Sequence, residues 1–330
     1  MSEGRTAVSA ADVERAAKDL GPHLPATPLQ YSPAFTAKAG CHVHLKIETV
    51  QPIRAFKVRG ALNKILNLSP EERARGVITA SAGNHGQGVA YAARAFGAPA
   101  TVFVPENANR LKVEAIRRLG ARVVQAGRNY DGAYREALRE RERQGSIFVH
   151  AFDDHDVIAG QGTVGVEMLR ELPEVDTVLV PVGGGGLIAG IATHVRSRLP
   201  RTRVVGVEPA GAACMRRSLE AGRPVALESV DTIADGLAAS RPGELCFEIA
   251  SRLVDEVVVV SDAEMLRAIR LLFEWEHLLT EPAGAAAVAA LLHHHRTSSH
   301  ETVAAVVSGA NVTDEVMIRA LTGGRQPSPD

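Results

Sequence analysis

The sequence predicts an α/β protein with two domains, each built on an open, mostly parallel, twisted sheet with helices on both sides. Three observations support this fold class. Short β-branched segments alternate with amphipathic segments along the chain, which is the pattern of βαβ units. The apolar segments are nearly continuous runs of Val, Ile and Leu, as expected of strands that are buried on both faces. The chain has 330 residues, which exceeds the length of an average single domain.

The expected elements form two series, each with alternating strands and helices, and the two series do not repeat each other in sequence. Lys57 opens an expected helix that ends at Leu66. Ser69 and Ser261 precede two further expected helices, where serine is a favoured N-cap residue. We expect strands at residues 76–81, 100–105, 121–127, 177–182, 203–209, 255–261 and 302–309.

The composition excludes several classes of function. Apolar residues make up 45% of the chain, and the formal net charge of −1 produces no field that would attract nucleic acid. The N-terminal segment has no apolar core of a signal peptide, and no run of about 18 uncharged apolar residues follows it. We therefore expect a cytoplasmic protein that binds neither nucleic acid nor membranes. Cys41, Cys214 and Cys246 lack metal-ligand spacing, so we expect them to be small buried residues.

Two local patterns in the first half of the chain are candidates for chemistry. Lys57 is a lone lysine after a turn-like segment, and taken alone it is better explained as a solvated charge on a helix. Residues 81–86, with the sequence SAGNHG, lie between an expected strand and an expected helix. Backbone N–H groups at such a junction, with glycines that permit close approach, suit a carboxylate. A purely structural turn is the alternative.

The third pattern is a run of four glycines at a junction between strand and helix. It comprises Gly183, Gly184, Gly185 and Gly186, followed by Leu187. Four glycines are costly in backbone entropy, so the close approach of a ligand explains them better than flexibility does. Phosphate is the natural ligand at the N-terminus of a helix.

A dinucleotide site is the rival interpretation of the same glycines. Gly184, Gly186 and Ala189 fit the GxGxxA fingerprint, and Glu208 ends the next expected strand, where a ribose-binding acid belongs. An NAD(P)-dependent oxidoreductase, however, leaves Lys57 and the SAGNHG turn without roles. This interpretation therefore ranks second.

Eight short motifs together resemble one enzyme family. In order between about Thr27 and Asn311, they are PIRAFKVRGA, SAGNHGQGVAYAA, HAFDDHDVIAGQGT, VPVGGGGLIAGIA, VVGVEP, TIADG, EPAGA and VVSGAN. The chain resembles the serine/threonine dehydratase branch of the fold-type II pyridoxal-phosphate (PLP) enzymes, which includes threonine dehydratases and serine racemases. The resemblance covers nearly the whole chain and implies a tryptophan synthase β-like fold.

The resemblance implies a role for each matching residue in PLP binding. Lys57 would form the Schiff base, Phe56 would lie against the cofactor, and Asn84 would hydrogen-bond its 3′-oxygen. The backbone of Gly183 to Leu187 would hold the 5′-phosphate, and Ser308 would face the pyridine nitrogen. Sequence alone leaves Ser308 equally explained as a turn residue at the end of a strand.

The implied reaction is the dehydration and deamination of a small amino acid such as L-threonine or L-serine to a 2-oxo acid and ammonia. The freed amine of Lys57 would remove the Cα proton before the β-hydroxyl leaves. Glu281 resembles a position near the cofactor ring, although an acid at a helix N-terminus is an equal alternative. The substrate carboxylate would lie on the backbone of Ser81, Ala82, Gly83, Asn84 and His85.

The resemblance also implies how the domains are arranged. Residues 76–152 would form a small mobile domain that closes over a large PLP-binding domain made of residues 1–75 and 153–330. We expect a homo-oligomer, either a dimer or a tetramer, as is usual in the family. Few residues follow Ser308, so we expect no C-terminal effector-binding domain.

Two departures from the family bear on the prediction. Racemases carry a second serine where this chain has Ala82, so dehydration is favoured over racemisation. In relatives that bind a divalent cation, a glutamate, a backbone carbonyl and a second acid correspond to Glu208, Ala212 and Cys214 of this chain. Mg²⁺ and Ca²⁺ require oxygen ligands, so the thiol makes this divalent cation site doubtful, and we predict no metal.

A third departure lies beside Lys57. Arg54 stands in a segment where the family usually has a Thr-Gly-Ser-like sequence. A guanidinium there is a candidate to bind an extra substrate carboxylate, such as that of 3-hydroxyaspartate. An arginine that points outward is an equal alternative. A 3-hydroxyaspartate dehydratase therefore stays open as an alternative. So do an amino-acid racemase and a β-replacement synthase that use the same cofactor.

Overall fold

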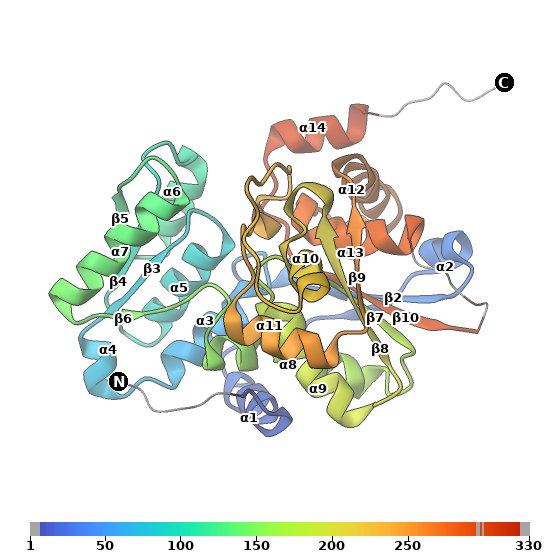
Figure 1. The fold of residues 1–330 in the computed structure, drawn as a ribbon, viewed down its shortest axis with the longest axis horizontal. Coiled ribbons are helices and arrows are strands. Elements are labelled where there is room, and N and C mark those ends of the chain that lie inside the picture. The colour runs from blue at the N-terminus through green and yellow to red at the C-terminus, as the bar shows by residue number, and fades with distance from the viewer. Residues whose placement is uncertain (1–6, 295–297, 299, 324–330) are drawn as a thin grey trace.

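The computed structural model of the chain describes residues 7–294, 298 and 300–323 (Figure 1). Its strands are β1 (Leu29–Tyr31), β2 (His42–Ile47), β3 (Val77–Ala80), β4 (Ala100–Val104), β5 (Arg122–Gln125), β6 (Ile147–Phe148), β7 (Thr177–Pro181), β8 (Arg203–Pro209), β9 (Glu256–Val260) and β10 (Thr302–Val307). Its α-helices are α1 (Ala10–Leu20), α2 (Pro33–Ala39), α3 (Lys57–Leu66), α4 (Pro70–Ala74), α5 (Asn84–Ala95), α6 (Arg110–Arg118), α7 (Tyr130–Gln144), α8 (His155–Glu171), α9 (Gly186–Arg198), α10 (Cys214–Ala221), α11 (Glu244–Leu253), α12 (Asp262–Glu276), α13 (Pro282–His293) and α14 (Asp314–Thr322). Short 3-10 helices are η1 (Glu48–Val50), η2 (Ala210–Ala212) and η3 (Asp235–Leu237).

The strands form two sheets, which lie at opposite ends of the long axis in Figure 1. The smaller sheet has the order β5-β4-β3-β6, and every neighbouring pair is parallel. Val102 and Val104 of β4 pack against α5 and α6, while Phe103 lies in a separate cluster with residues of β3 and α7. Helices therefore cover both faces of this sheet, as its apolar strands predict.

The larger sheet has the order β1-β2-β10-β7-β8-β9. All of its pairs are parallel except the antiparallel edge pair β1 and β2. In β10, Val303, Ala305 and Val307 belong to the core shared with α12 and α13, while Ala304 and Val306 belong to the core shared with α8 and α9. Because successive side chains of a strand point to opposite faces, both faces of this sheet are buried.

The expected fold class is confirmed. The helix expected from Lys57 to Leu66 has those bounds, and Ser69 and Ser261 cap α4 and α12 through their side chains. The three cysteines are buried, and none forms a disulfide. Strand β2 was not expected from the sequence, because His42, His44 and Lys46 interrupt its apolar residues. It lies inside the larger sheet beside β10.

A buried ion-pair network explains how Lys46 is accommodated within β2. Its Nζ lies 2.7 Å from Glu167 Oε2 of α8. Arg59 of α3 also binds Glu167, at 2.6 Å, and binds Glu48 of η1 at 2.7 Å. Thr27 donates its hydroxyl to Glu48 at 2.5 Å. The network therefore joins α3 to the larger sheet and to α8.

The network keeps its charges despite burial. Desolvation opposes the charge on Arg59, yet the carboxylates of Glu48 and Glu167 outweigh it and raise the pKa of the guanidinium. Desolvation likewise opposes the charge on Glu167, but Arg59 and Lys46 lower its pKa to about 2. Losing one member of such a network is costly, because its partners stay buried without compensation.

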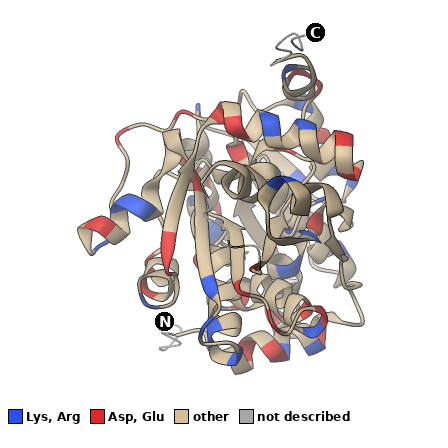
Figure 2. Ribbon diagram, turned by 90° about the vertical axis from the view of Figure 1, so that its right-hand side faces the viewer, with Lys and Arg blue, Asp and Glu red and all other residues tan. Residues whose placement is uncertain are grey.

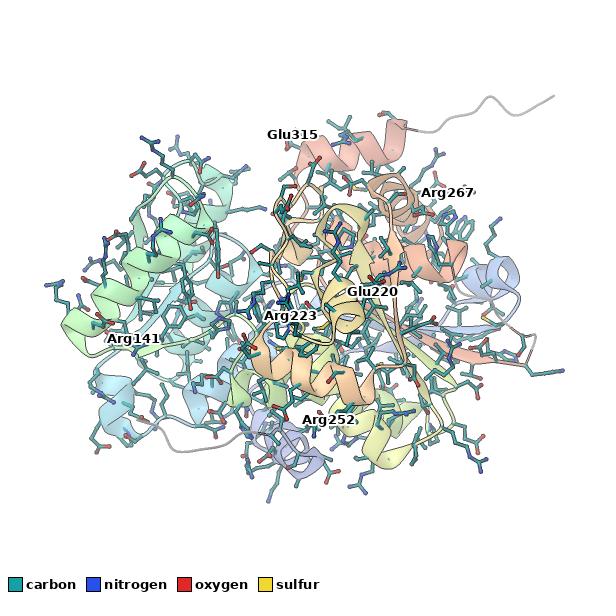
Figure 3. The ribbon with its side chains drawn as sticks, viewed as in Figure 1. Arg141, Glu220, Arg223, Arg252, Arg267 and Glu315 are labelled. Atoms are coloured by element: carbon teal, nitrogen blue, oxygen red, sulfur yellow. The ribbon has the colours of Figure 1, made fainter. Side chains whose placement is uncertain are left out.

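The outer surface carries interspersed charges of both signs (Figure 2). Arg141, Glu220 and Arg252, which Figure 3 labels, are exposed side chains on α7, α10 and α11. This mixture agrees with the net charge of −1. None of the described helices is long and apolar enough to cross a lipid bilayer.

We expect Arg59→Met to lower the free energy of unfolding by about 3 kcal/mol or more, because Glu48 then remains buried without its cation. Urea unfolding followed by circular dichroism measures the change. Arg139→Met removes the same charge from an exposed i,i+3 pair with Glu136, so its effect stays below about 0.5 kcal/mol. An equal loss of unfolding free energy in Arg59→Met and Arg139→Met would show that the buried network stabilises the fold no more than an exposed ion pair does.

Candidate active site

Lys57 lies at the first turn of α3 with its amine in the interior. Its Nζ donates a hydrogen bond to the carbonyl oxygen of Ala151 at 2.7 Å and lies 5.2 Å from the centroid of the Phe56 ring. The Phe56 backbone N–H donates to the Ser308 carbonyl oxygen at 3.1 Å. The structure therefore brings Phe56, Lys57 and Ser308 together, although Ser308 lies at the end of β10.

The surroundings of Lys57 disfavour positive charge. Burial lowers the pKa of its amine to about 8, and Cys246 opposes this shift only in part. Burial, together with the Lys57 charge, lowers the pKa of His85 to about 3. His85 Nε2 lies 3.0 Å from the Val149 carbonyl, an oxygen that only accepts, so Nε2 carries the proton. His85 is therefore neutral, and Lys57 is the basic group that titrates near neutral pH.

The SAGNHG turn presents backbone donors at the start of α5. Gly83 is the N-cap residue and has no side chain that could bond the first N–H groups of the helix. Its own N–H donates to Ser81 Oγ at 3.2 Å. Within the described ranges, the N–H groups of Ala82, Asn84 and His85 donate to no other residue. A carboxylate would satisfy such groups.

The side chain of Asn84 lies in a chain of short hydrogen bonds. Its Nδ2 donates to Glu281 Oε1 at 2.6 Å, and its Oδ1 accepts from Asn311 Nδ2 at 2.6 Å. Glu281 is the N-cap residue of α13 and is 4% exposed. Burial first, and the Asp235 charge second, raise its pKa to about 7. Asn84 and Glu281 thus meet across 197 positions of sequence.

The four-glycine loop connects β7 to α9 and is closely packed. A Cβ at Gly184 would lie 2.4 Å from the Phe152 ring, and a Cβ at Gly185 would lie 2.8 Å from Cys246 Cβ. Gly185 also has φ +102°, which favours glycine. Contacts with protein atoms therefore require these glycines even before any ligand is considered. Close packing against the protein is thus a reason for these glycines beside the ligand approach that the sequence suggested.

The same loop nevertheless fits an anion. Gly184, Gly185, Gly186 and Leu187 are buried. In the part of the chain that the structure describes, neither their N–H groups nor that of Gly183 donate to any residue. Buried N–H groups without partners are rare in proteins. Several at one helix N-terminus match a phosphate, the anionic group of PLP.

Residues 20–309 match the family described as pyridoxal-phosphate-dependent enzyme. The chain belongs to this family. Curated L-threonine ammonia-lyases from Thermotoga maritima and Geobacter sulfurreducens are 43% and 47% identical to it. These alignments cover 95% and 87% of this chain and 78% and 71% of the two relatives.

Solved structures agree with the fold-type II assignment. Maize serine racemase is 34% identical with a TM-score of 0.91, and the match covers 96% of this chain and 97% of that one. Processed threonine deaminase isoform 2 of Solanum lycopersicum is 36% identical with a TM-score of 0.90, covering 98% and 97%. The resemblance inferred from the eight motifs is confirmed.

The residues that correspond to a cation site in some relatives are used differently here. Both oxygens of Glu208 accept backbone N–H groups, from Met215 at 2.8 Å and from Arg216 at 2.9 Å, at the start of α10. Burial raises the pKa of Glu208 to about 7 and that of the Cys214 thiol to about 12. A largely protonated thiol beside a carboxylate that caps a helix is a poor ligand set for a hard cation.

Arg54 lies in the bend before α3. It is exposed and has φ +60°, a left-handed conformation that is unfavourable for arginine. Its N–H donates to the Gln51 carbonyl, and its own carbonyl accepts from Ala310. The guanidinium has no hydrogen bond or ion pair with any described residue. The backbone of Arg54, rather than its side chain, is tied to the site.

Four contributors to the site were not assigned by the sequence. Ala151 accepts the Lys57 hydrogen bond, and Phe152 packs on the glycine loop. The Cys246 thiol donates to the Phe152 carbonyl at 3.4 Å and influences Lys57. Asn311 binds Asn84. Ala151, Phe152 and Asn311 lie in motifs on which the family resemblance rests. This resemblance was the one sequence signal that could have assigned them to the site.

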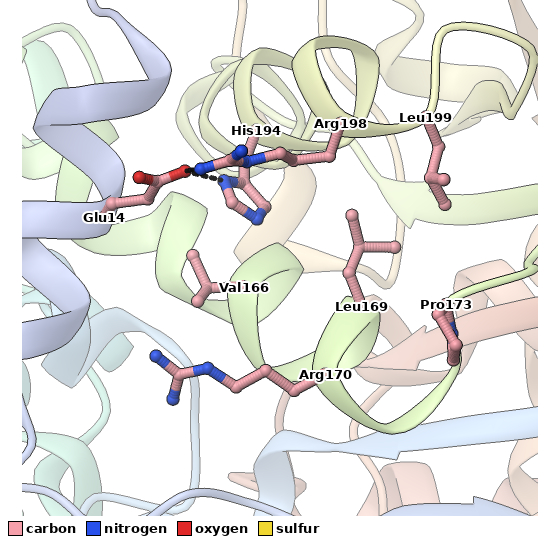
Figure 4. A pocket seen from close by; sticks show the side chains of 8 residues that line it. All are labelled: Glu14, Val166, Leu169, Arg170, Pro173, His194, Arg198 and Leu199. Atoms are coloured by element: carbon pink, nitrogen blue, oxygen red, sulfur yellow. Dashed lines mark hydrogen bonds and ion pairs between the residues drawn. The ribbon is translucent and has the colours of Figure 1, made fainter.

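A separate cavity of about 460 Å³ lies among α1, α8 and α9 (Figure 4). Glu14 pairs there with Arg198, and His194 Nδ1 lies 3.7 Å from Glu14. Val166, Leu169 and Leu199 contribute apolar walls. No predicted site residue lines this cavity, so we do not associate it with the reaction.

The pKa of Lys57 predicts a pH-dependent effect on the stability of the PLP-free protein. At pH 7 the fold buries a charged amine, so we expect Lys57→Met to be more stable than wild type by about 2 kcal/mol, allowing for one lost hydrogen bond. Above pH 8 the folded state releases the proton while the unfolded state, with a pKa of 10.5, retains it. The free energy of unfolding of the wild type therefore rises with pH, and the stability advantage of Lys57→Met narrows towards pH 10.5.

Urea unfolding at a series of pH values measures this difference. Lys64→Met on the same helix is the matched control, because Asp154 and Asp156 outweigh desolvation and raise the pKa of Lys64. That variant should be less stable than wild type at pH 7. Equal stability of Lys57→Met and wild type at every pH would show that burial of this amine is not costly.

Proposed function

We propose that this chain uses PLP to dehydrate and deaminate a small hydroxy amino acid, with L-threonine as the leading substrate and L-serine as the second. The products are a 2-oxo acid and ammonia. The proposal rests on a buried lysine amine with a pKa of about 8 and on two groups of backbone N–H donors that have no acceptor among the residues the structure describes. The threonine ammonia-lyase names of the relatives support the choice of substrate.

The chain's own residues hold the cofactor in this proposal. The N–H groups of Gly183 to Leu187 bind its phosphate, and Lys57 attaches to it covalently. Phe56, Asn84 and Glu281 lie around its ring, and Ser308 is the partner of its ring nitrogen. When bound, PLP supplies a carbonyl group that combines with the substrate amine and a ring that withdraws electrons from Cα.

Lys57 acts as the general base. With a pKa of about 8, its amine loses its proton far more readily than an ordinary lysine does, and the neutral fraction, about one tenth at pH 7 and rising with pH, accepts the Cα proton. The N–H groups of Ala82, Asn84 and His85 bind the substrate carboxylate at the positive end of α5. With a pKa of about 3, the imidazole of His85 is too weak a base to compete with Lys57 for that proton.

Ser308 adjusts the reaction through its lack of charge. Its Oγ donates to the Ala283 carbonyl at 3.3 Å, and the residue is 3% exposed. A neutral hydroxyl holds the ring nitrogen protonated less strongly than a carboxylate would. With PLP bound, Ser308 would thus leave the ring a weaker acceptor of charge from Cα, which would favour prompt departure of the β-hydroxyl over transamination.

Closure of residues 76–152 over residues 1–75 and 153–330 excludes water in this proposal. Two contacts support it: Lys112 of α6 forms an ion pair with Asp235 of η3, and Asn84 of α5 bonds Glu281 of α13. Family membership further supports a homo-oligomer, dimer or tetramer, located in the cytoplasm.

The alternative reactions are less well supported. Serine racemase shares this fold, so the backbone does not exclude racemisation. Ala82, however, has no hydroxyl to protonate the face opposite Lys57. The family match disfavours an NAD(P)-dependent oxidoreductase. No observation on the described residues favours a β-replacement synthase over the dehydratase.

With PLP added, we expect the wild-type protein to absorb visible light and to form a 2-oxo acid from L-threonine. Lys57→Ala should lose the absorption that borohydride bleaches and at least about 100-fold of the activity, because it removes both the attachment and the base. Lys64→Met should retain both properties. A colourless wild-type protein that borohydride does not modify would exclude the proposed function.

We expect Arg54→Gly to raise the free energy of unfolding by up to about 1 kcal/mol, because it relieves a left-handed arginine. The ratio of kcat/KM for 3-hydroxyaspartate to that for L-threonine should stay within about 2-fold of wild type, since the guanidinium is exposed. His277→Gly, at φ +55°, is the control for the gain in stability. A selective loss of 3-hydroxyaspartate turnover in Arg54→Gly alone would instead assign Arg54 to that substrate.

A further inference from the structure

The Asn311, Asn84 and Glu281 chain has a fixed direction. Asn311 Nδ2 donates to the Ile53 carbonyl oxygen at 2.9 Å as well as to Asn84 Oδ1 at 2.6 Å. A backbone carbonyl only accepts, so the nitrogen of Asn311 must be the end that faces both oxygens. The carbonyl of Ile53 thereby determines which way the Asn311 amide points.

The orientation of Asn84 follows from that of Asn311. With the Asn311 nitrogen on one side and the Glu281 carboxyl oxygen on the other, the Asn84 amide must point its oxygen to Asn311 and its nitrogen to Glu281. A turned amide would place two N–H groups together and two oxygens together. The contact with Asn311 would be repulsive in every protonation state, and the contact with Glu281 would be repulsive whenever its carboxyl is ionised, so one amide orientation is selected.

The surrounding backbone leaves little room for these groups to rearrange. A Cβ at Gly309 would lie 2.4 Å from Glu281 Oε1 and 3.3 Å from Asn84 Nδ2. The Glu281 N–H donates to the Gly309 carbonyl at 3.1 Å. Burial raises the pKa of Glu281 to about 7 although the Asn311 backbone lowers it, and the ionised form of the carboxyl can only accept from Asn84. The segment after β10 therefore holds both neighbours of Asn84.

We propose that Asn311 is a positioning residue that fixes the Asn84 amide with its nitrogen towards Glu281, so that the same nitrogen would also be able to donate to bound PLP. The Nδ2 group has two hydrogens, and only one is used by Glu281. The second remains available for an anionic oxygen of the PLP ring. This inference rests on the proposed function, and it assigns to Asn311 an effect that operates through Asn84 rather than through direct contact.

The test measures the affinity of the protein for PLP by titration of the PLP-free form, followed by visible absorption. We expect Asn311→Asp to weaken binding about 10-fold, because a carboxylate cannot donate and repels the Asn84 oxygen. Asn311→Ala should weaken it about 3-fold, since Asn84 then loses its preferred orientation. Asn311→Ala leaves no unpaired charge, so it carries the test if the aspartate variant does not fold.

Two further variants separate positioning from a general effect on structure. Asn129→Asp makes the same substitution at the exposed N-cap of α7, where aspartate is also favoured, and should bind PLP within about 2-fold of wild type. The double variant Asn84→Ala/Asn311→Ala should bind no more weakly than Asn84→Ala alone, because Asn311 acts through Asn84. Additive losses would overturn the proposal.

The outcomes distinguish this inference from the proposed function. A wild-type protein that binds no PLP overturns the proposed function. Tight wild-type binding that both Asn311 variants retain overturns the positioning role alone. Weaker binding in the Asn311 variants, together with non-additivity in the double variant, supports the role of Asn311.

Discussion

The site depends on holding the amine of Lys57 in the interior at the start of α3. This position is unfavourable for a charge and lowers its pKa to about 8, so other contacts must stabilise the helix. Two residues further along, Arg59 is bound to Glu48 and Glu167 in a network that reaches the larger sheet and α8. The ion pairs of Arg59 thus hold the start of α3 in place although charges are costly to bury. The Lys57 amine forms no ion pair with the described residues, and its lowered pKa is what suits it to the proposed role as a base.

Sheet topology explains why distant segments meet around that amine. In parallel sheets, the segments that follow the carboxyl ends of the strands gather at one edge, where ligands bind. The glycine loop follows β7 and Ser308 follows β10, its neighbour in the larger sheet. Residues 81–86 follow β3 of the smaller sheet and reach these segments through the hydrogen bond between Asn84 and Glu281. The isolated bridge between Ala55 and Gly309 then joins the segment before Lys57 to the segment after β10. In the proposed function, each segment supplies backbone donors or a neutral hydroxyl, and Lys57 supplies the base.

Sequence patterns predicted those parts of the site that depend on local signals. The bounds of α3, the junction at 81–86 and the glycine loop each follow from residue type and neighbouring elements. Contacts between distant positions carry no such signal: Lys57 meets Ala151 across 94 positions, and Asn311 meets Asn84 across 227. Strand β2 was missed because its lysine is buried by partners elsewhere in the chain.

The choice of reaction lies in individual side chains rather than in the fold. A serine racemase and a threonine deaminase match this chain almost equally well, with TM-scores of 0.91 and 0.90. A backbone common to both cannot determine whether Cα is reprotonated or the β-hydroxyl leaves. Reprotonation on the opposite face needs a donor, and the methyl group of Ala82 cannot provide one. With a base on one face only, elimination is the outcome that the available groups favour.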